Sequence, residues 1–210
     1  KLDRIRISSI EPTTIPESLI KLMKTSSKLC PYLHLPLQSG SDKILAAMSR
    51  KYTTKDYLDY AKYVKNEITN LCIGTDVIVG FPTENDHDFE TTKTFLTVAP
   101  IDYFHVFSYS ERKFARSKKI NDKINPHIIH NRSKSLQKLS TKKKQEFMKK
   151  HIDQTKNVHF EQLKKDGLWY GITDNFIRVA TKSDTNLKNK IIPMTLTHLK
   201  AEHVYGDVIL

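Results

Sequence analysis

The stretch HLPLQSGSDKILAAMSRKY at residues 34–52 begins as a buried strand and continues as a short helix. Residues 38–42 between the two are all small or polar. Such residues end strands, and they are typical of loops. In α/β folds, however, ligands bind at the carboxyl ends of strands. The stretch therefore predicts either an ordinary turn or one side of a ligand site.

Four predicted strands alternate with helices along the first 110 residues. Strands are expected at 5–10, 32–37, 71–81 and 102–109, and helices at 16–25, 42–49, 54–68 and 85–98. This alternation is typical of an α/β fold with a parallel sheet and helices packed against it. Right-handed crossovers would bring the four strand ends to one rim. Polar or glycine-containing sequence is expected there at Glu11 and at residues 38–41, 80–82 and 108–110.

The pattern changes in the second half of the chain. Residues 127–151 predict a long basic helix with a sparse apolar stripe. Short strands are then expected at 156–161, 169–173, 177–181, 191–199 and 203–210. Five short strands in about 60 residues favour a small antiparallel β-barrel. We therefore expect two domains, residues 1–151 and residues 152–210.

The net charge of +12 is concentrated in one segment. Residues 111–165 contain 17 Lys or Arg and 5 Asp or Glu, which accounts for the whole excess. A local excess of this size favours a polyanionic partner, nucleic acid first, although a solvated lysine-rich helix is the alternative. The candidate RNA-binding residues are Lys142, Lys143, Lys144, Lys149 and Lys150.

The two cysteines, Cys30 and Cys72, are 42 positions apart and suggest neither a metal site nor a disulfide framework. We expect both to be buried thiols in a reducing cytoplasm. No apolar run approaches the roughly 20 residues that a membrane-spanning helix needs. The sequence lacks an initiator Met and reads as a strand from its first residues, so we expect it to be part of a longer protein.

Five motifs occur along the chain: SSIEP at 8–12, HLPLQSGSD at 34–42, MSRKYT at 48–53, TDVIVGFP at 75–82 and HVFSYS at 105–110. Their order and spacing resemble those of the radical S-adenosylmethionine (radical SAM) methylthiotransferases. The predicted C-terminal barrel resembles the RNA-binding TRAM domain of that family. The resemblance covers nearly the whole chain.

The resemblance implies a partial, open radical SAM barrel of the TIM-like type, followed by a TRAM domain. Enzymes of the family use S-adenosylmethionine and two 4Fe–4S clusters to replace a C–H bond with a methylthio group. The cluster ligands are absent from this sequence, so we assign no catalytic residue and expect this chain alone to be inactive. The cofactor-binding residues that the resemblance implies are Glu11, Gln38, Ser39, Gly40, Ser41, Arg50, Asp76, Gly80, Phe81 and Tyr109.

Single side chains favour a tRNA substrate. The family branch that acts on a ribosomal protein has His where this chain has Ser39, and residues 76–78 and 110–112 resemble the threonylcarbamoyl-adenosine branch more than the isopentenyl-adenosine branch. We therefore expect a monomeric tRNA methylthiotransferase that binds the anticodon arm and modifies the hypermodified adenosine beside the anticodon. The alternative is a non-catalytic RNA-binding module. Residues 83–85 and 113–116 depart from the family pattern.

A few single residues have two interpretations each. Arg50 is a candidate for holding a carboxylate or phosphate, or it forms a surface ion pair. Trp169 and Tyr170 either stack on RNA bases or pack in the core of the small barrel. His127 is expected, together with the nearby His130, on a helix surface rather than on a metal.

Overall fold

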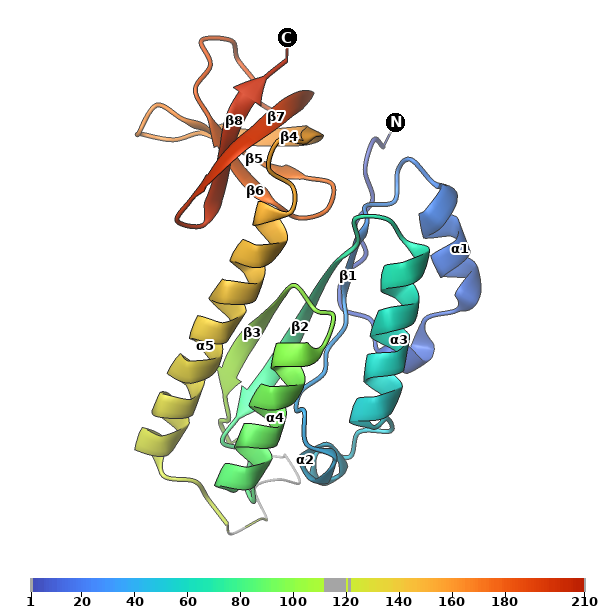
Figure 1. The fold of residues 1–210 in the computed structure, drawn as a ribbon, viewed down its shortest axis with the longest axis vertical. Helices are drawn as coiled ribbons and strands as arrows, with labels where there is room; N and C mark the ends of the chain where they lie inside the picture. The colour runs from blue at the N-terminus through green and yellow to red at the C-terminus, as the bar shows by residue number, and fades with distance from the viewer. Residues whose placement is uncertain (1, 112–119, 121, 210) are drawn as a thin grey trace.

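The computed structural model describes residues 2–111, 120 and 122–209. A parallel sheet covered by helices forms one part, a closed five-stranded barrel forms the other, and the long helix α5 (Pro126–Lys149) leads from the first to the second (Figure 1). The sequence departure at residues 113–116 lies outside the described residues.

The parallel sheet has the strand order β1 (Tyr32–His34), β2 (Cys72–Val79) and β3 (Tyr103–Ser108). The elements around it are η1 (Pro12–Thr14), α1 (Glu17–Thr25), α2 (Asp42–Ala47), α3 (Thr54–Glu67) and α4 (Asp86–Val98). Capping boxes start two of these helices, Thr53 with Asp56 at α3 and Asn85 with Asp88 at α4. Each box satisfies backbone N–H groups that have no partner within the helix.

The prediction of a first strand at residues 5–10 is wrong. The segment forms only an isolated bridge between Ile5 and Leu29, and the Ile10 N–H donates to the His34 carbonyl at 3.1 Å. The chain turns tightly at Pro31, where the Tyr32 N–H donates to the Cys30 carbonyl at 2.7 Å. This turn breaks the register between the segment and β1, so a continuous ladder does not form.

The second predicted strand, residues 32–37, is shortened to three residues by Pro36, which has no N–H to donate. The Leu37 N–H donates to the Thr75 side-chain Oγ1 at 2.9 Å instead of to a backbone carbonyl. Pairing with β2 resumes as a single bridge between Gln38 and Val77.

The two faces of the parallel sheet differ in chemistry, because successive side chains of a strand point to opposite faces. One face is apolar and packs on the helices through residues such as Leu33, Ile73, Val77 and Phe104. The opposite face, called the inner face below, carries Tyr32, His34, Cys72, Asp76, Ile78, Tyr103, His105 and Phe107. The register places Asp76 beside His105 and Ile78 beside Phe107. Phe107 is 52% exposed, so this face is only partly covered in this chain.

The closed barrel contains β4 (Thr155–Leu163), β5 (Trp169–Thr173), β6 (Arg178–Thr181), β7 (Ile191–Lys200) and β8 (His203–Val208) in the order β4-β5-β6-β8-β7. The predicted barrel is confirmed, but it is not wholly antiparallel, because β6 and β8 run parallel. Trp169 is buried, and its Nε1–H donates to the Ser183 carbonyl at 3.2 Å, so it packs in the barrel core.

The small barrel packs against the amino-terminal end of the parallel strands (Figure 1). Phe176, in the turn between β5 and β6, contacts the rings of Tyr32 and Tyr103 at centroid distances of 4.4 and 5.9 Å. The Arg6 guanidinium lies over Tyr32 and Phe176 and donates to the Thr173 carbonyl at 3.1 Å. The barrel and the sheet therefore share a core at one end, and the rim with the sequence motifs lies at the other.

Candidate functional site

Gly80 and the residues after it form the rim at the carboxyl end of β2. Gly80 has a φ of +79°, and a Cβ at this position would overlap the side chain of Ile129. Its N–H donates to Glu84 Oε2 at 3.1 Å. Phe81 packs edge-on against Tyr109 at 5.4 Å, and the Tyr109 N–H donates to the Val79 carbonyl. Only glycine satisfies both the backbone conformation and the close approach of α5.

The turn at residues 38–41 is fixed to α4. Ser39 Oγ lies 3.2 Å from Thr92 Oγ1, and the Gly40 N–H donates to that same oxygen at 3.1 Å. Ser41 Oγ donates to Asp88 Oδ1 at 3.1 Å. A Cβ on Gly40 would lie 2.8 Å from Thr92 Cα. The small residues of this turn thus let α4 approach the strand end closely, and their predicted role in cofactor binding stays a prediction.

Gln38 begins the same turn with a φ of +73°, an uncommon conformation for a residue other than glycine. Its backbone is held from both sides: its N–H donates to the Asp76 carbonyl, and its carbonyl accepts from the Ile78 N–H. The Gln38 backbone therefore lies beside residues 76–78 of β2.

Glu11 and Arg50 meet at this rim. Arg50 Nη1 lies 2.7 Å from Glu11 Oε1, and their side chains are 29% and 46% exposed. Arg50 therefore forms an ion pair within this chain, which was the second of its two interpretations. Both assignments to cofactor binding stay predictions.

The inner face carries a polar cluster of which only Asp76 was a candidate from the sequence. His34 Nε2 lies 3.0 Å from Asp76 Oδ2, and the His34 and His105 rings are stacked with centroids 6.0 Å apart. Burial lowers the pKa of His105 below its usual value, and Asp76 opposes this effect. The sequence signal was present, because His34 and His105 occupy alternate positions in apolar strands.

Comparisons with known proteins agree with this geometry. Residues 1–96 match the model of the radical SAM superfamily. Over 208 residues the chain is 31% identical to the threonylcarbamoyladenosine tRNA methylthiotransferase MtaB of Bacillus subtilis, a match that covers 97% of this chain and 46% of the relative. The chain belongs to the radical SAM methylthiotransferase family.

Two further relatives of the family show its range. The MtaB protein of Aquifex aeolicus is 41% identical over 150 residues, which are 71% of this chain and 37% of the relative. The tRNA-2-methylthio-N(6)-dimethylallyladenosine synthase of Campylobacter jejuni subsp. doylei is 32% identical over 208 residues, which are 99% of this chain and 48% of the relative. The chain spans about half the length, or less, of these curated relatives.

A solved structure supports the fold alone. Coproporphyrinogen III oxidase (HemN) of Escherichia coli, a radical SAM enzyme, superposes with a TM-score of 0.57 at 11% identity. The match covers 99% of this chain and 51% of that one. The expected relation to a radical SAM fold is confirmed.

The family's iron–sulfur chemistry needs ligands that this chain does not provide. Among the described residues, no group of three or more His, Cys, Asp or Glu side chains is placed to hold a metal ion. Cys30 and Cys72 are both buried free thiols, and burial raises the pKa of Cys72 well above its usual value. A cluster needs thiolates that converge on it, so neither cysteine is suited to the task. No helix in the described ranges has the length and apolar character to cross a membrane.

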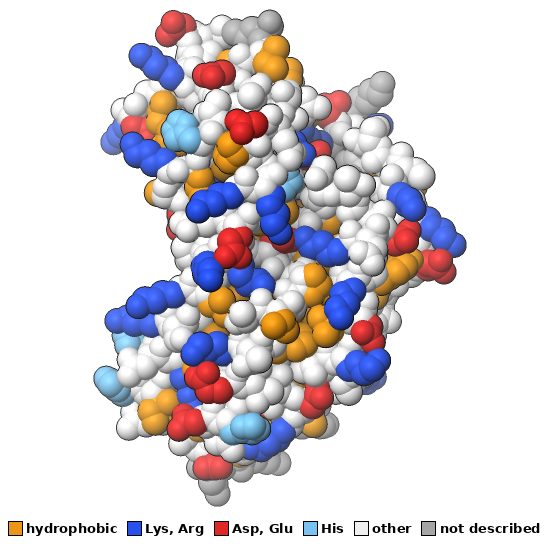
Figure 2. All heavy atoms as spheres, viewed as in Figure 1, with side chains coloured by type: hydrophobic (Ala, Val, Ile, Leu, Met, Phe, Trp, Pro, Cys, Tyr) orange, Lys and Arg blue, Asp and Glu red, His pale blue; other side chains and the backbone are white. Residues whose placement is uncertain are grey.

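The five candidate RNA-binding lysines, on α5 and at its C-cap Lys150, do not form one surface. Lys143 Nζ donates to the Thr97 and Ala99 carbonyls at the end of α4, and burial lowers its pKa. Lys142 is exposed and lies 3.9 Å from Glu146, and Lys149 and Lys150 are also exposed. Figure 2 shows Lys and Arg mixed with Asp and Glu on the face that it displays. The RNA-binding role of these lysines stays a prediction, although Lys143 has a structural partner.

The exposed sides of α5 and of the small barrel hold the remaining candidates. His127 and His130 are exposed on α5, as expected. Tyr170 is half-buried, and its hydroxyl donates to Asp166 Oδ2 at 2.7 Å, so unlike Trp169 it is not part of the barrel core.

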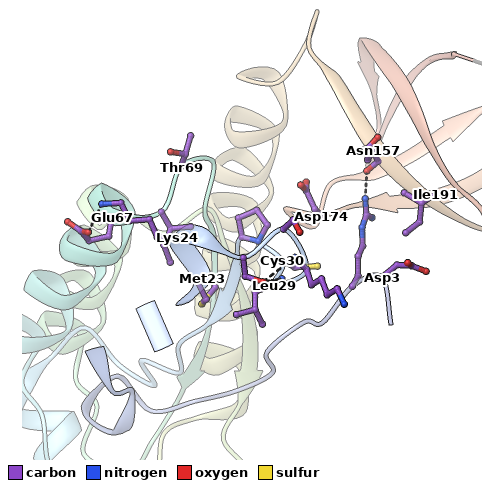
Figure 3. A pocket seen from close by; sticks show the side chains of 16 residues that line it. Asp3, Met23, Lys24, Leu29, Cys30, Glu67, Thr69, Asn157, Asp174 and Ile191 are labelled. Atoms are coloured by element: carbon purple, nitrogen blue, oxygen red, sulfur yellow. Dashed lines mark hydrogen bonds and ion pairs between the residues drawn. The ribbon is translucent and has the colours of Figure 1, made fainter. Parts of the chain in front are cut away.

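A cleft of about 550 Å³ lies between the first residues, the segment after α1 and the small barrel (Figure 3). Three of its charged side chains already have partners: Lys24 pairs with Glu67 at 3.1 Å, and Arg4 Nη2 donates to the Asn157 carbonyl at 2.8 Å. The cleft is at the end of the sheet opposite the motif rim, so it joins the two parts of the chain rather than forming the candidate cofactor site.

Proposed function

We propose that this chain is part of a tRNA methylthiotransferase that adds a methylthio group to the hypermodified adenosine next to the anticodon. Two observations together support this proposal. The chain is similar along nearly its whole length to two kinds of tRNA methylthiotransferase, and motif residues lie on one rim of a parallel sheet. The preferred substrate is threonylcarbamoyl-adenosine, supported by the 41% identity to the Aquifex relative.

The closed barrel after α5 is proposed to be the TRAM domain, with the tRNA anticodon arm as its partner. Its position after a basic helix and its five-stranded closed order support this assignment. In the intact family, S-adenosylmethionine and two 4Fe–4S clusters supply the radical chemistry. The residues of this chain are proposed to contribute the rim around Gly80, the ion pair of Glu11 with Arg50, and the surface that holds RNA.

The substrate is tested on the complete reading frame that contains this chain. Expression in a host lacking its own methylthiotransferases, followed by mass spectrometry of digested tRNA, should reveal the methylthio derivative of threonylcarbamoyl-adenosine. A methylthio derivative of isopentenyl-adenosine alone would correct the substrate. Neither product, in a host that makes both precursors, would reject the enzyme.

The second candidate, a non-catalytic RNA-binding module, is favoured by the lack of a ligand set for a cluster among the described residues. Reconstitution of residues 1–210 with iron and sulfide tests whether this chain alone can act as an enzyme. We expect no stoichiometric cluster in visible absorption and no cleavage of S-adenosylmethionine. A reading frame whose upstream part encodes Cys-x3-Cys-x2-Cys supports the enzyme, and a natural start near residue 1 supports the module.

A further inference from the structure

The outer surface of the small barrel carries a row of rings. Strand register places Tyr170 beside Ala180, Ala180 beside Tyr205, and Tyr205 beside His198. Residues that pair across strands share a face, and the alternate residues Trp169, Val179 and Val204 are buried in the core. Tyr170 also contacts His203 edge-on at 5.0 Å, and His198 stacks on Tyr205 at 5.2 Å. Four rings therefore lie together on the outside of the barrel.

Cationic side chains border this row. Lys164 Nζ lies 3.8 Å from the centroid of the Tyr170 ring. Arg178 is exposed on β6 and pairs with Ile172 of β5. This cross-strand pair is on the same face as the pair of Tyr170 with Ala180 and lies next to it. Burial is the main cause of the lowered pKa of His203, and Lys164, Arg178 and Lys144 lower it further. Lys164 borders this ring, because it lies on Tyr170, which contacts His203. The acidic neighbours are Glu202, which acts on Lys144, and Asp166, which accepts from Tyr170.

One of these cations also lies next to the parallel sheet. Lys144 is one helical turn after Ser140, whose Oγ accepts from the Phe104 N–H at 2.9 Å, so Lys144 lies on the sheet side of α5. Burial is the main cause that lowers the pKa of His105 on the inner face, and the charges of Lys144 and Arg178 also lower it. Neither Lys144 nor Arg178 makes a side-chain hydrogen bond or ion pair within the described part of the chain. These two cations without partners therefore lie beside the parallel sheet, in the case of Lys144, and beside the row of rings, in the case of Arg178.

We propose that Lys164, Tyr170, His203, Arg178 and Lys144 form a track that binds a single-stranded RNA segment and leads it from the small barrel to His105 on the inner face. Unpaired bases stack on exposed rings, and cations beside those rings contact the phosphates. An acidic peptide would use the cations but would gain nothing from a row of rings. The inference rests on the proposed RNA-binding function, and it assigns that function to residues different from the exposed lysines of α5.

The test compares two charge-matched double variants of the full chain, residues 1–210. Lys144→Met with Arg178→Met removes two track cations and keeps their aliphatic stems. Lys142→Met with Lys149→Met removes two exposed cations from α5 outside the track. The probe is a fluorescein-labelled anticodon stem–loop RNA, and binding is followed by anisotropy at several salt concentrations. Circular dichroism and Trp169 fluorescence verify that each variant is folded.

The track variant should weaken binding by at least roughly 10-fold more than the control, and its salt slope should fall by about one unit for each phosphate that the protein no longer neutralises. Tyr170→Ala should weaken binding about 5- to 100-fold with an unchanged slope, because stacking is not ionic. Equal losses of affinity in the two double variants, or an unaffected Tyr170→Ala, would overturn the track. Polyglutamate binding as tight as RNA would favour a general polyanion site instead.

A cross-linking experiment tests the direction of the strand. The loop of the same RNA is labelled with 4-thiouridine, irradiated with the wild-type chain, and the modified peptides are identified by mass spectrometry. Adducts on β3 near His105 are expected together with adducts on the small barrel. Adducts confined to the outer side of α5 would refute the path. Failure of the wild-type chain to bind the RNA at all would instead contradict the RNA-binding part of the proposed function.

Discussion

Replacing Asn175 with Ala or with Asp should change the stability of the chain in different ways as the pH falls, because Asn175 holds His151 in its neutral form. His151 is buried where α5 meets the small barrel, and its Nδ1 lies 2.9 Å from the Phe147 carbonyl, to which it must donate. Its Nε2 lies 3.0 Å from Asn175 Nδ2. Thr173 Oγ1 donates to Asn175 Oδ1 at 2.7 Å, which orients the amide so that its NH₂ group faces the histidine.

The sign of the pH effect follows from this arrangement. Burial is the main cause that lowers the pKa of His151 below its usual value, and the positive charge of Lys156 also lowers it. The hydrogen bond to the Phe147 carbonyl acts in the opposite direction and raises this pKa. As the pH falls through about 6.5, the unfolded chain takes up a proton before the folded chain does. This contribution to stability is therefore complete above pH 6.5 and is lost as the pH falls towards the pKa of the folded state. One such group changes the free energy of unfolding by at most about 1.4 kcal/mol per pH unit.

The magnitudes come from the hydrogen bonds of Asn175, which is fully buried. Asn175→Ala leaves the Thr173 hydroxyl and His151 Nε2 without their partner, and each unpaired buried group costs about 1–3 kcal/mol. The expected loss of stability at pH 7.5, summed over the two groups, is thus about 2–6 kcal/mol. Asn175→Asp places an acceptor opposite Nε2, which favours protonated His151. Its stability relative to wild type should therefore improve as the pH falls below 6.5.

Urea denaturation at pH 5.5, 6.5, 7.5 and 8.5 measures these effects, with Trp169, the single tryptophan, as the probe. Other histidines titrate in the same range, so the informative quantity is the difference between each variant and wild type at each pH. A difference between wild type and Asn175→Asp that stays constant with pH would refute the assignment of His151 as the linked group. A cost below about 0.5 kcal/mol for Asn175→Ala, less than a single unpaired buried group requires, would refute the stabilising role of the network.

Three further predictions concern the parallel sheet and its rim. Arg132→Ala should lower the free energy of unfolding, measured by urea denaturation, by about 3–5 kcal/mol, because it leaves the buried Glu84 without its partner at 2.6 Å. Asp86→Ala should lower it by under about 1 kcal/mol, because the Asp86 side chain is 94% exposed. Similar losses in the two variants would show that the buried pair is not special. The Cys72 thiol, whose pKa is raised by burial, should react with a maleimide only as fast as the chain opens, and rapid labelling under native conditions would contradict its burial. In hydrogen exchange, residues 5–10 should be protected far less than β2, because they make few ladder bonds, and equal protection would mean that the segment is a true strand.

Local chemistry determined much of this protein from the sequence alone. The capping residues Thr53 and Asn85, the continuous apolar run of β2 and the Gly80 break each act through their own backbone or near neighbours, so the helices, the strands and the rim could be predicted. The five linked motifs likewise identified the family. The predicted strand at 5–10 failed because alternation specifies a side-chain pattern but not a partner in register, and the turn at Pro31 removes that partner.

Tertiary structure decided which chemically similar side chains act together. Lys142, Lys143 and Lys144 are adjacent in sequence, yet the helix turns them in different directions: towards solvent, towards the carbonyls at the end of α4, and towards the parallel sheet. His34, Asp76 and His105 come from three strands, and only the parallel register brings them onto one face. The same holds for the parallel pairing of β6 with β8, because sequence patterns record how a strand alternates but not which distant strand closes the barrel.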